Sequence, residues 1–343
     1  MNHSSFSPFY ERPVKYFSGF MVGEFLISVM LGLIVLALLY ITIDETIFSD
    51  WTAFLPVIIS TAMFSLYVAT YRLRSLFPEM DARLHPKKSD VYLVPLNKYL
   101  SNKHFILAGI AFGSTNCLMG YAYGLPYQGD TVISIAIMAS YFIVGFVCGM
   151  AAYSIFAVSL SINVFTKEAS HSLDYTSPDN CGGTKIFGDA LLVFGGVTLV
   201  VGVMISVYII KAGWLYDENW WRVSLKMFWI IFPYLMSITV LIVPSSVINA
   251  VLRKYKLEQE VILKVRLAKI NEQLAQTNVA PERLKELRDD YKFIKSSRET
   301  LYEMRTWPID IGANYKFLTI LIGNATVSGK VSYSWLDELG LFK

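Results

Sequence analysis

The chain has 343 residues, of which 54% are hydrophobic and only 17% are charged. A soluble domain usually carries about 25% charged residues, so this composition excludes an ordinary soluble protein and indicates an integral membrane protein. The formal net charge of +3 says little, because the charges are unevenly distributed along the chain. Cys117, Cys148 and Cys181 have no metal-ligand spacing, and we expect no disulfide framework.

Six long apolar runs predict six transmembrane helices, because about 20 helical residues cross the hydrocarbon core of a bilayer. The runs are Phe25–Ile43, Trp51–Tyr71, Phe105–Leu125, Thr131–Phe165, Ala190–Ile210 and Met227–Ala250. A backbone in lipid must satisfy its own hydrogen bonds, so each run is expected to be a helix. We expect three antiparallel pairs: the first run with the second, the third with the fourth, and the fifth with the sixth.

Basic residues in the short loops predict the orientation, because Lys and Arg mark the cytoplasmic side. The loops Asp44–Asp50 and Pro126–Asp130 contain none. The loop between the second and third runs contains Arg72, Arg74, Arg83, Lys87, Lys88, Lys98 and Lys103. Both termini are therefore predicted to be cytoplasmic. The chain divides into a six-span domain, 1–252, with cytoplasmic loops 72–104 and 166–186, a cytoplasmic hairpin, 253–306, and a tail, 307–343, of undetermined fold.

Three pairs of glycines recur at four-residue spacing within the apolar runs. Gly109 and Gly113, and Gly120 and Gly124, lie in the third run, and Gly145 and Gly149 lie in the fourth. This G-x-x-x-G spacing places both glycines on one helix face and allows two backbones to approach closely. The spacing predicts helix packing, either within one chain or between subunits.

The six runs contain no charged residue at mid-membrane, where such a residue would indicate an ion or proton relay. Asn116 is the most polar mid-span residue, and we interpret it as an interhelical hydrogen-bonding group or a pore-lining position. Pro233 and Pro244 in the sixth run predict either a simple bend or a gating hinge. Motifs for catalysis or cofactor binding do not occur, so we expect no enzyme, no metal and no cofactor.

The segment before the fifth run contains Asp179, Gly182, Gly183 and Thr184. Asp179 or Thr184 is a candidate cap for the following helix. The two glycines also permit an alternative, in which backbone amides bind a phosphate at the helix start.

The sixth run continues without a helix breaker into a charged segment, Arg253–Gln276, and a second helix is predicted from Pro281 to about Arg305. In the first segment, apolar residues with 4-3-4 spacing are Leu263, Leu267, Ile270 and Leu274. In the second, the predicted heptad seam is Leu284, Leu287, Tyr291, Ile294, Arg298 and Leu301. These narrow stripes predict an antiparallel hairpin that packs on copies from neighbouring subunits.

Between residues 253 and 305 the sequence has 13 Lys or Arg against nine Asp or Glu. One interpretation is a solvated coiled-coil face with lipid-headgroup contacts near its start. The other is a site for an anionic ligand, a nucleotide or single-stranded DNA, held by phosphate contacts. The candidate ligand-binding residues are Arg253, Lys254, Lys256, Lys264, Arg266, Lys269, Arg283, Lys285, Arg288, Lys292, Lys295 and Arg298.

This layout, together with the short segments Asp179–Gly183 (DNCGG) and Met304–Pro308 (MRTWP), resembles the membrane effectors of bacterial anti-phage defence, in particular the channel-like HalA of the Hailong system. The resemblance covers the order of elements: six spans followed by a helical hairpin. It implies a homotetramer that depolarises the bacterial inner membrane. It also implies a resting state held shut by DNA oligomers bound to the cytoplasmic part.

The sequence therefore predicts an all-α integral membrane protein with a cytoplasmic antiparallel helical hairpin. We expect a homo-oligomeric channel or pore-type effector that is gated through its cytoplasmic helical region. A small-solute transporter, which would use the broken sixth helix, and a non-conducting membrane scaffold are the alternatives.

Overall fold

A computed structural model describes residues 10, 21–43, 45–48, 51–83, 99, 101–122, 131–168, 173–211, 220–275 and 280–309. Within these residues the protein is helical and has no β-strand. The elements are α1 (Val22–Ile43), η3 (Glu45–Phe48), α2 (Phe54–Arg83), α4 (Asn102–Ala122), α5 (Thr131–Glu168), α6 (Lys185–Lys211), α7 (Trp220–Leu274) and α8 (Pro281–Glu303). The predicted loop residues 84–98 and 123–130 and the tail beyond residue 309 lie outside the described residues.

Six of the described helices, α1, α2, α4, α5, α6 and α7, are long and apolar enough to cross a membrane. This confirms the prediction of six apolar helical spans. The expected pairs are also found, because α1 packs on α2, α4 on α5, and α6 on α7. α2 additionally contacts α5 and α6, and α5 contacts α7, so these four helices are connected to one another beyond the three pairs.

The contact between α4 and α5 is formed by four glycines of two G-x-x-x-G pairs, Gly109 with Gly113 and Gly145 with Gly149. A Cβ atom on Gly145 would lie 2.8 Å from the carbonyl oxygen of Phe112 and 2.9 Å from the Cα of Gly113. A Cβ on Gly149 would lie 2.6 Å from the carbonyl oxygen of Ala108. On the α4 side, Gly109 and Gly113 each face an α5 phenylalanine ring. The close backbone contact therefore lies within one chain.

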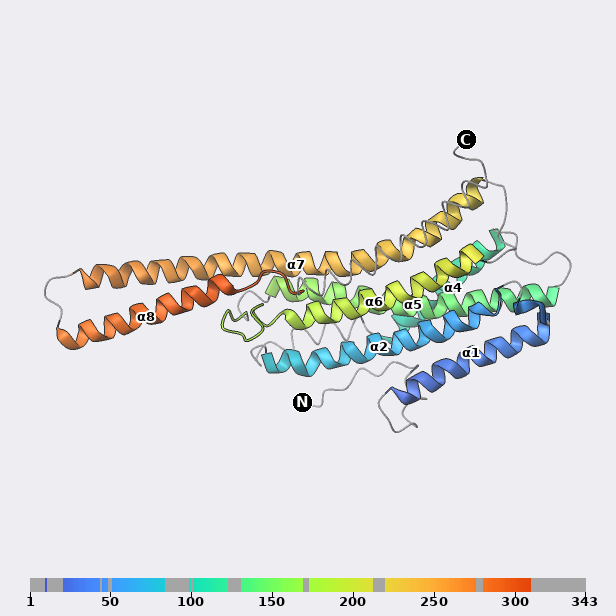
Figure 1. Ribbon diagram of the computed structural model, residues 1–343, viewed down its shortest axis with the longest axis horizontal. Helices are drawn as coiled ribbons and strands as arrows, with labels where there is room; N and C mark the ends of the chain where they lie inside the picture. Colours follow the sequence, from blue (N-terminus) through green and yellow to red (C-terminus); the bar gives the residue numbers. More distant parts are fainter. Residues whose placement is uncertain are drawn as a thin grey trace.

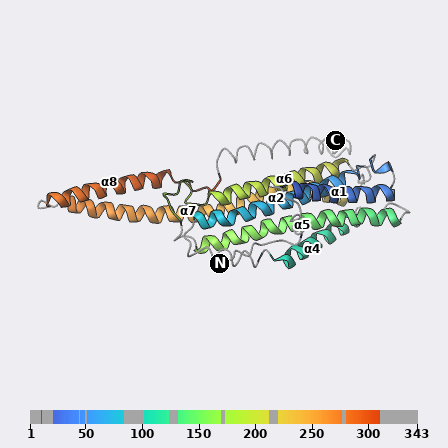
Figure 2. The same cartoon turned by 90° about the horizontal axis from the view of Figure 1, so that it is seen from below.

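α7 is a single helix of 55 residues that contains both Pro233 and Pro244. At 1.5 Å per residue it is about 80 Å long, far more than the roughly 30 Å of a bilayer core requires. Figure 1 shows that its first part curves along the bundle and its second part projects beyond it, where α8 runs back beside it. Figure 2 shows the same projection after a 90° turn. The expected division at residue 253 therefore falls inside one continuous helix.

Substitution of Gly145 by alanine tests the α4–α5 contact. Gly145→Ala is expected to lower the unfolding free energy by about 1–3 kcal/mol, because the new methyl group meets backbone atoms that cannot move aside. Gly196→Ala is the matched control, since no atom lies within 4 Å of the position of its Cβ. Thermal unfolding of both variants in the same detergent is the measurement. Equal melting temperatures would contradict the close packing.

Candidate functional site

The α7–α8 hairpin is held by an apolar seam. Leu263 and Ile270 of α7 are buried, as are Leu287, Ile294 and Leu301 of α8. The predicted seam is wrong at two positions: Tyr291 is exposed, and Ser297 rather than Arg298 is fully buried. A straight helix has 3.6 residues per turn, so a strict heptad pattern drifts around its surface and exchanges one position for its neighbour.

A polar chain crosses the hairpin beside this seam. The Tyr302 hydroxyl donates to Glu260 Oε1 at 3.0 Å, and Arg298 Nη2 donates to the Tyr302 hydroxyl oxygen at 2.9 Å. Lys264 Nζ lies 2.9 Å from the same Glu260 oxygen. The Tyr302–Glu260 hydrogen bond joins α8 to α7, and Arg298 and Lys264, both candidates for binding an anionic ligand, each bond one of these two partners within their own helix.

The remaining basic candidates are distributed along both helices of the hairpin. Lys256 is half-buried, and the exposed ones are Arg253, Lys254, Arg266, Lys269, Arg283, Lys285, Arg288, Lys292 and Lys295. Four of them, Lys285, Arg288, Lys292 and Lys295, have 3-4-3 spacing and therefore share one face of α8. We call these four residues the basic stripe. Of the predicted anionic-ligand positions, the basic stripe is the most regular group.

The two short segments quoted for the anti-phage resemblance lie against each other, although more than 120 residues separate them. The backbone N–H of Arg305 donates to the carbonyl oxygen of Asn180 at 2.7 Å. The Cys181 thiol donates to the Trp307 carbonyl at 3.4 Å. A Cβ on Gly182 would lie 2.9 Å from the methyl carbon of Met304. The end of α8 is thereby attached to the loop that leads into α6.

Lys256 of α7 completes this attachment. Its ammonium group donates to the carbonyl oxygens of Tyr302 at 2.9 Å and Met304 at 2.8 Å, at the end of α8. A cation at this position satisfies carbonyls that have no partner within the helix and complements the helix dipole. We call the contact of the loop 173–184, the α7 residues 252–256 and the segment 301–309 the junction.

Asp179 organises the loop of the junction. Its Oδ1 accepts hydrogen bonds from the N–H groups of Cys181 at 2.9 Å and Gly183 at 3.0 Å, and Oδ2 accepts one from Lys185 at 3.2 Å. Burial disfavours the charged form, but these hydrogen bonds outweigh it and lower the pKa of Asp179 below its ordinary value of 3.8. Asp179 is therefore the cap of α6.

The same hydrogen bonds also bear on the alternative prediction, in which the backbone amides near Gly182 and Gly183 bind a phosphate. Gly182 and Gly183 have φ angles of 64° and 88°, which favour glycine, and they bring the amides round to one point. That point holds the Asp179 carboxylate, so the protein's own anion already occupies the amide donors. Thr184 instead donates its hydroxyl to the Cys181 carbonyl at 2.7 Å.

The predicted hinge residues lie on the face of α7 that packs into the bundle. Pro233 is buried against Gly202 of α6, where a Cβ atom would overlap the proline ring. Hydroxyl groups fix the two helices on either side of it: Ser206 donates to the Ile230 carbonyl at 3.2 Å, and Ser237 donates to the Gly195 carbonyl at 2.8 Å. Pro244 is also buried. α6 and α7 are therefore joined most firmly around Pro233.

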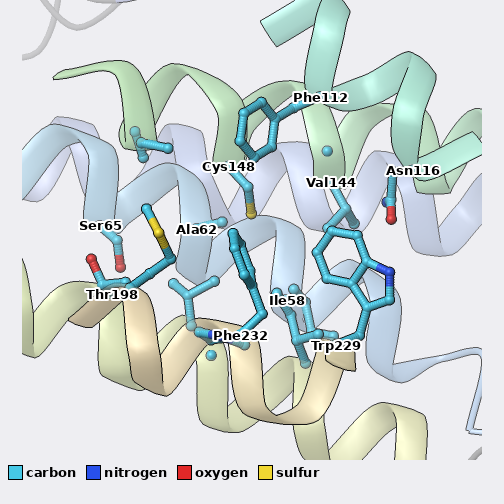
Figure 3. Close-up of a pocket in the computed structure, with 18 of the residues that line it drawn as sticks. Ile58, Ala62, Ser65, Phe112, Asn116, Val144, Cys148, Thr198, Trp229 and Phe232 are labelled. Carbon is cyan, nitrogen blue, oxygen red and sulfur yellow. The ribbon is translucent and has the colours of Figure 1, made fainter. Parts of the chain in front are cut away.

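Asn116 both bonds to a neighbouring helix and lines a cavity. Its Nδ2 donates to the carbonyl oxygen of Tyr141 at 2.7 Å, which makes it an interhelical hydrogen bond between α4 and α5. It also lines a cavity of about 190 Å³, which is formed by residues of α2, α4, α5, α6 and α7. Figure 3 shows Phe112 and Asn116 on one side of this cavity and Trp229 and Phe232 on the other.

Most of the cavity lining gives no signal in the sequence. Small residues such as Ala62, Ala151 and Ala152 are part of the lining. Within an apolar run, an alanine at a cavity wall looks the same as an alanine in a packed contact. Of the predicted site residues, Asn116, Gly145 and Pro233 line it, and each is marked in the sequence only by its residue type or spacing.

Comparison of the chain with protein-family models, with curated proteins and with solved structures finds no match in any of the three. The resemblance to anti-phage effectors stays a prediction. Its two quoted segments form one contact in the structure, which gives them a physical role in joining α8 to α6.

Replacement of Asp179 by asparagine tests the cap. At neutral pH, Asp179→Asn is expected to lower the unfolding free energy by about 1–3 kcal/mol. The substitution removes the negative charge and replaces one acceptor oxygen by an NH2 group, which cannot accept the hydrogen bond from the Lys185 N–H. The folded pKa lies below the ordinary value, so the carboxylate stabilises the fold above that value and stops doing so as the pH falls through the folded pKa.

The difference between wild type and Asp179→Asn should therefore be constant near neutral pH and shrink in acid below the ordinary pKa of 3.8. Thermal unfolding in detergent at several pH values measures it. Asp290→Asn removes an exposed carboxylate of α8 and serves as the control. A difference that does not shrink in acid would rule out the carboxylate as its cause.

Proposed function

We propose that the protein is a multi-pass protein of the bacterial inner membrane whose copies assemble into a homo-oligomeric channel, gated through the α7–α8 hairpin. Six helices of sufficient length and apolarity support insertion. The basic loop that begins at Arg72 supports cytoplasmic termini and a cytoplasmic hairpin. The proposal has three further supports, of which the exposed face of α7 carries the most weight.

One exposed apolar face continues from the bundle part of α7 into the hairpin. In the bundle it contains Phe228, Ile231, Leu235, Ile242 and Val243. In the hairpin it contains Leu257, Val261 and Val265, which are 63%, 60% and 50% exposed. Lipid can cover the first group. The second group lies among charged residues and needs cover from protein.

A second copy of α7 is the partner that fits both parts. A symmetric neighbour presents the same apolar-to-charged transition at the same height, so lipid-facing and water-facing parts match in register. Ser246 and Ala250, exposed and four residues apart, allow close approach at the transition. Burial of large apolar side chains at such a contact contributes about 1.5–3 kcal/mol for each one fully covered.

Such an arrangement would surround a symmetry axis with an uncharged surface. Between Phe228 and Ala250, the described polar groups on this face include the hydroxyls of Thr239 and Ser246, and each donates to its own helix backbone. A channel on the axis therefore needs no charged residue within the spans, in agreement with their composition.

The junction supports control by the hairpin. α7 is continuous from the bundle into the hairpin, and the end of α8 is attached both to α7 by Lys256 and to the loop before α6. Any displacement of the hairpin therefore acts on α6 and α7 together. The basic stripe supports regulation by an anionic ligand that binds the hairpin. The resemblance to anti-phage effectors implies a nucleotide or single-stranded DNA as that ligand.

The oligomer is tested by a charge on the exposed face of α7. Val261→Asp is expected to convert the assembly into monomers, because each contact would bury an unpaired carboxylate. Gln273→Asp places the same charge at an exposed polar position of the same helix and should leave the assembly intact. Light scattering of the detergent-solubilised protein gives its mass. The proposal would be refuted if the wild type were monomeric, or if the reconstituted wild type never conducted ions.

The control by the hairpin is tested at Lys256. Lys256→Met removes both hydrogen bonds to the end of α8 while retaining most of the length of the side chain. If the hairpin holds the channel shut at rest, ion flux from proteoliposomes should rise about fivefold or more, the factor expected from about 1 kcal/mol of lost contact. Lys254→Met, two residues away and exposed, should leave the flux unchanged. If Lys256→Met and Lys254→Met gave equal ion flux, the junction would have no part in gating.

A further inference from the structure

The cavity among α2, α4, α5, α6 and α7 is long and narrow. Leu55, near the start of α2, and Ala69, four turns further along the same helix, both line it. At 1.5 Å per residue these positions are about 20 Å apart. A volume of about 190 Å³ over that length gives the cross-section of a chain rather than of a compact solute.

The walls of the cavity are almost entirely hydrocarbon. Four polar residues at its wall bond to the protein: Asn116 Nδ2 donates to the Tyr141 carbonyl at 2.7 Å, Thr198 donates to the Phe194 carbonyl at 2.8 Å, and the Tyr141 and Tyr208 hydroxyls are 3.0 Å apart. Ser65 and Trp229 add one hydroxyl and one indole N–H to the lining. A buried water molecule needs two to four polar partners, and an apolar cavity of about 150 Å³ is known to stay dry and to bind benzene. The site therefore favours an apolar occupant over water or a polar solute.

A buried cation lies near one end of the cavity. Lys226 is 6% exposed and precedes Trp229 by three residues and Pro233 by seven, so it shares a face of α7 with these two lining residues. The cavity reaches this end of the bundle, since Ile209 near the end of α6 also lines it. An apolar channel with an ammonium group beyond its end matches a molecule with a hydrocarbon chain and an anionic head.

We propose that this cavity binds one acyl chain of an anionic phospholipid, with Lys226 contacting the phosphate. The inference rests on membrane insertion, one part of the proposed function, and is independent of the channel and of the oligomer. Acyl chains are the apolar molecules that surround the six apolar helices in a bilayer. The same observations argue against a transport site for a polar small solute.

The test uses full-length protein purified in detergent and stripped of lipid. Phosphatidylglycerol or phosphatidylcholine is added, and the melting temperature and the lipid retained in native mass spectrometry are recorded. Ala152→Leu fills the cavity wall, and Ala111→Leu adds the same side chain on the exposed face of α4. Lys226→Met removes the cation and retains most of the side chain.

We expect phosphatidylglycerol to raise the melting temperature of wild type and of Ala111→Leu by several degrees, because a ligand that binds only the folded state stabilises it. Ala152→Leu should lose this shift and the retained lipid. Lys226→Met should retain both lipids equally. Absence of a shift in wild type, or an equal shift in Ala152→Leu, overturns the site, and unchanged selectivity in Lys226→Met overturns the role of the cation.

Extraction of membranes with alkaline carbonate separates this outcome from failure of the proposed function. A chain that leaves the membrane refutes insertion itself. A chain that stays in the membrane but shows no lipid-dependent shift refutes only the lipid site.

Discussion

The continuity of α7 is the constraint on which the rest of the structure depends. A helix that passes from an apolar segment into a charged one must keep its backbone hydrogen bonds throughout, because an unpaired amide in an apolar environment costs several kcal/mol. Pro233 interrupts that ladder, and the structure compensates by fixing the helix to α6 through Ser206 and Ser237 on either side. These bonds join α6 to α7, and the loop before α6 lies at the start of the hairpin.

Two helix ends meet at the junction, and each is satisfied by a charge from a neighbouring segment. The start of α6 receives the carboxylate of Asp179, and the end of α8 receives the ammonium group of Lys256. Both charges have the sign that the helix dipole prefers at that end. The junction is thus built from complementary electrostatics as well as from packing, and its geometry is specific to the pairing of these two ends.

The sequence allowed prediction of the features that depend on local pattern. Apolar runs predicted six helices because the thickness of the hydrocarbon core requires about 20 consecutive apolar residues in each helix. The glycine pairs predicted a close helix contact but left its partner open, since Phe112 and Phe146 are conspicuous only once α4 and α5 lie together. Asp179 was recognisable as a cap because a carboxylate before Gly-Gly-Thr suits a helix start.

Long-range contacts could not be predicted in the same way. Lys256 looked like one more basic residue of the hairpin, because its acceptors are backbone carbonyls nearly fifty residues away and carry no sequence signal. Ser297 rather than Arg298 lies in the seam because a straight helix has 3.6 residues per turn, whereas a heptad pattern assumes 3.5. The cavity is a property of how five helices fit together, so no single segment records it.

The attachment of α7 around Pro233 has a mechanical consequence. Pro233 divides the helix into arms of about 20 Å towards Trp220 and about 60 Å towards Leu274. If α7 tilts as a unit about this attachment, it behaves as a lever with unequal arms. A sideways movement of about 6 Å at the tip of the hairpin would then reappear, reversed in direction and about 2 Å in size, at the far end of the bundle. The displacement would be reduced about threefold, and the force would be increased by the same factor.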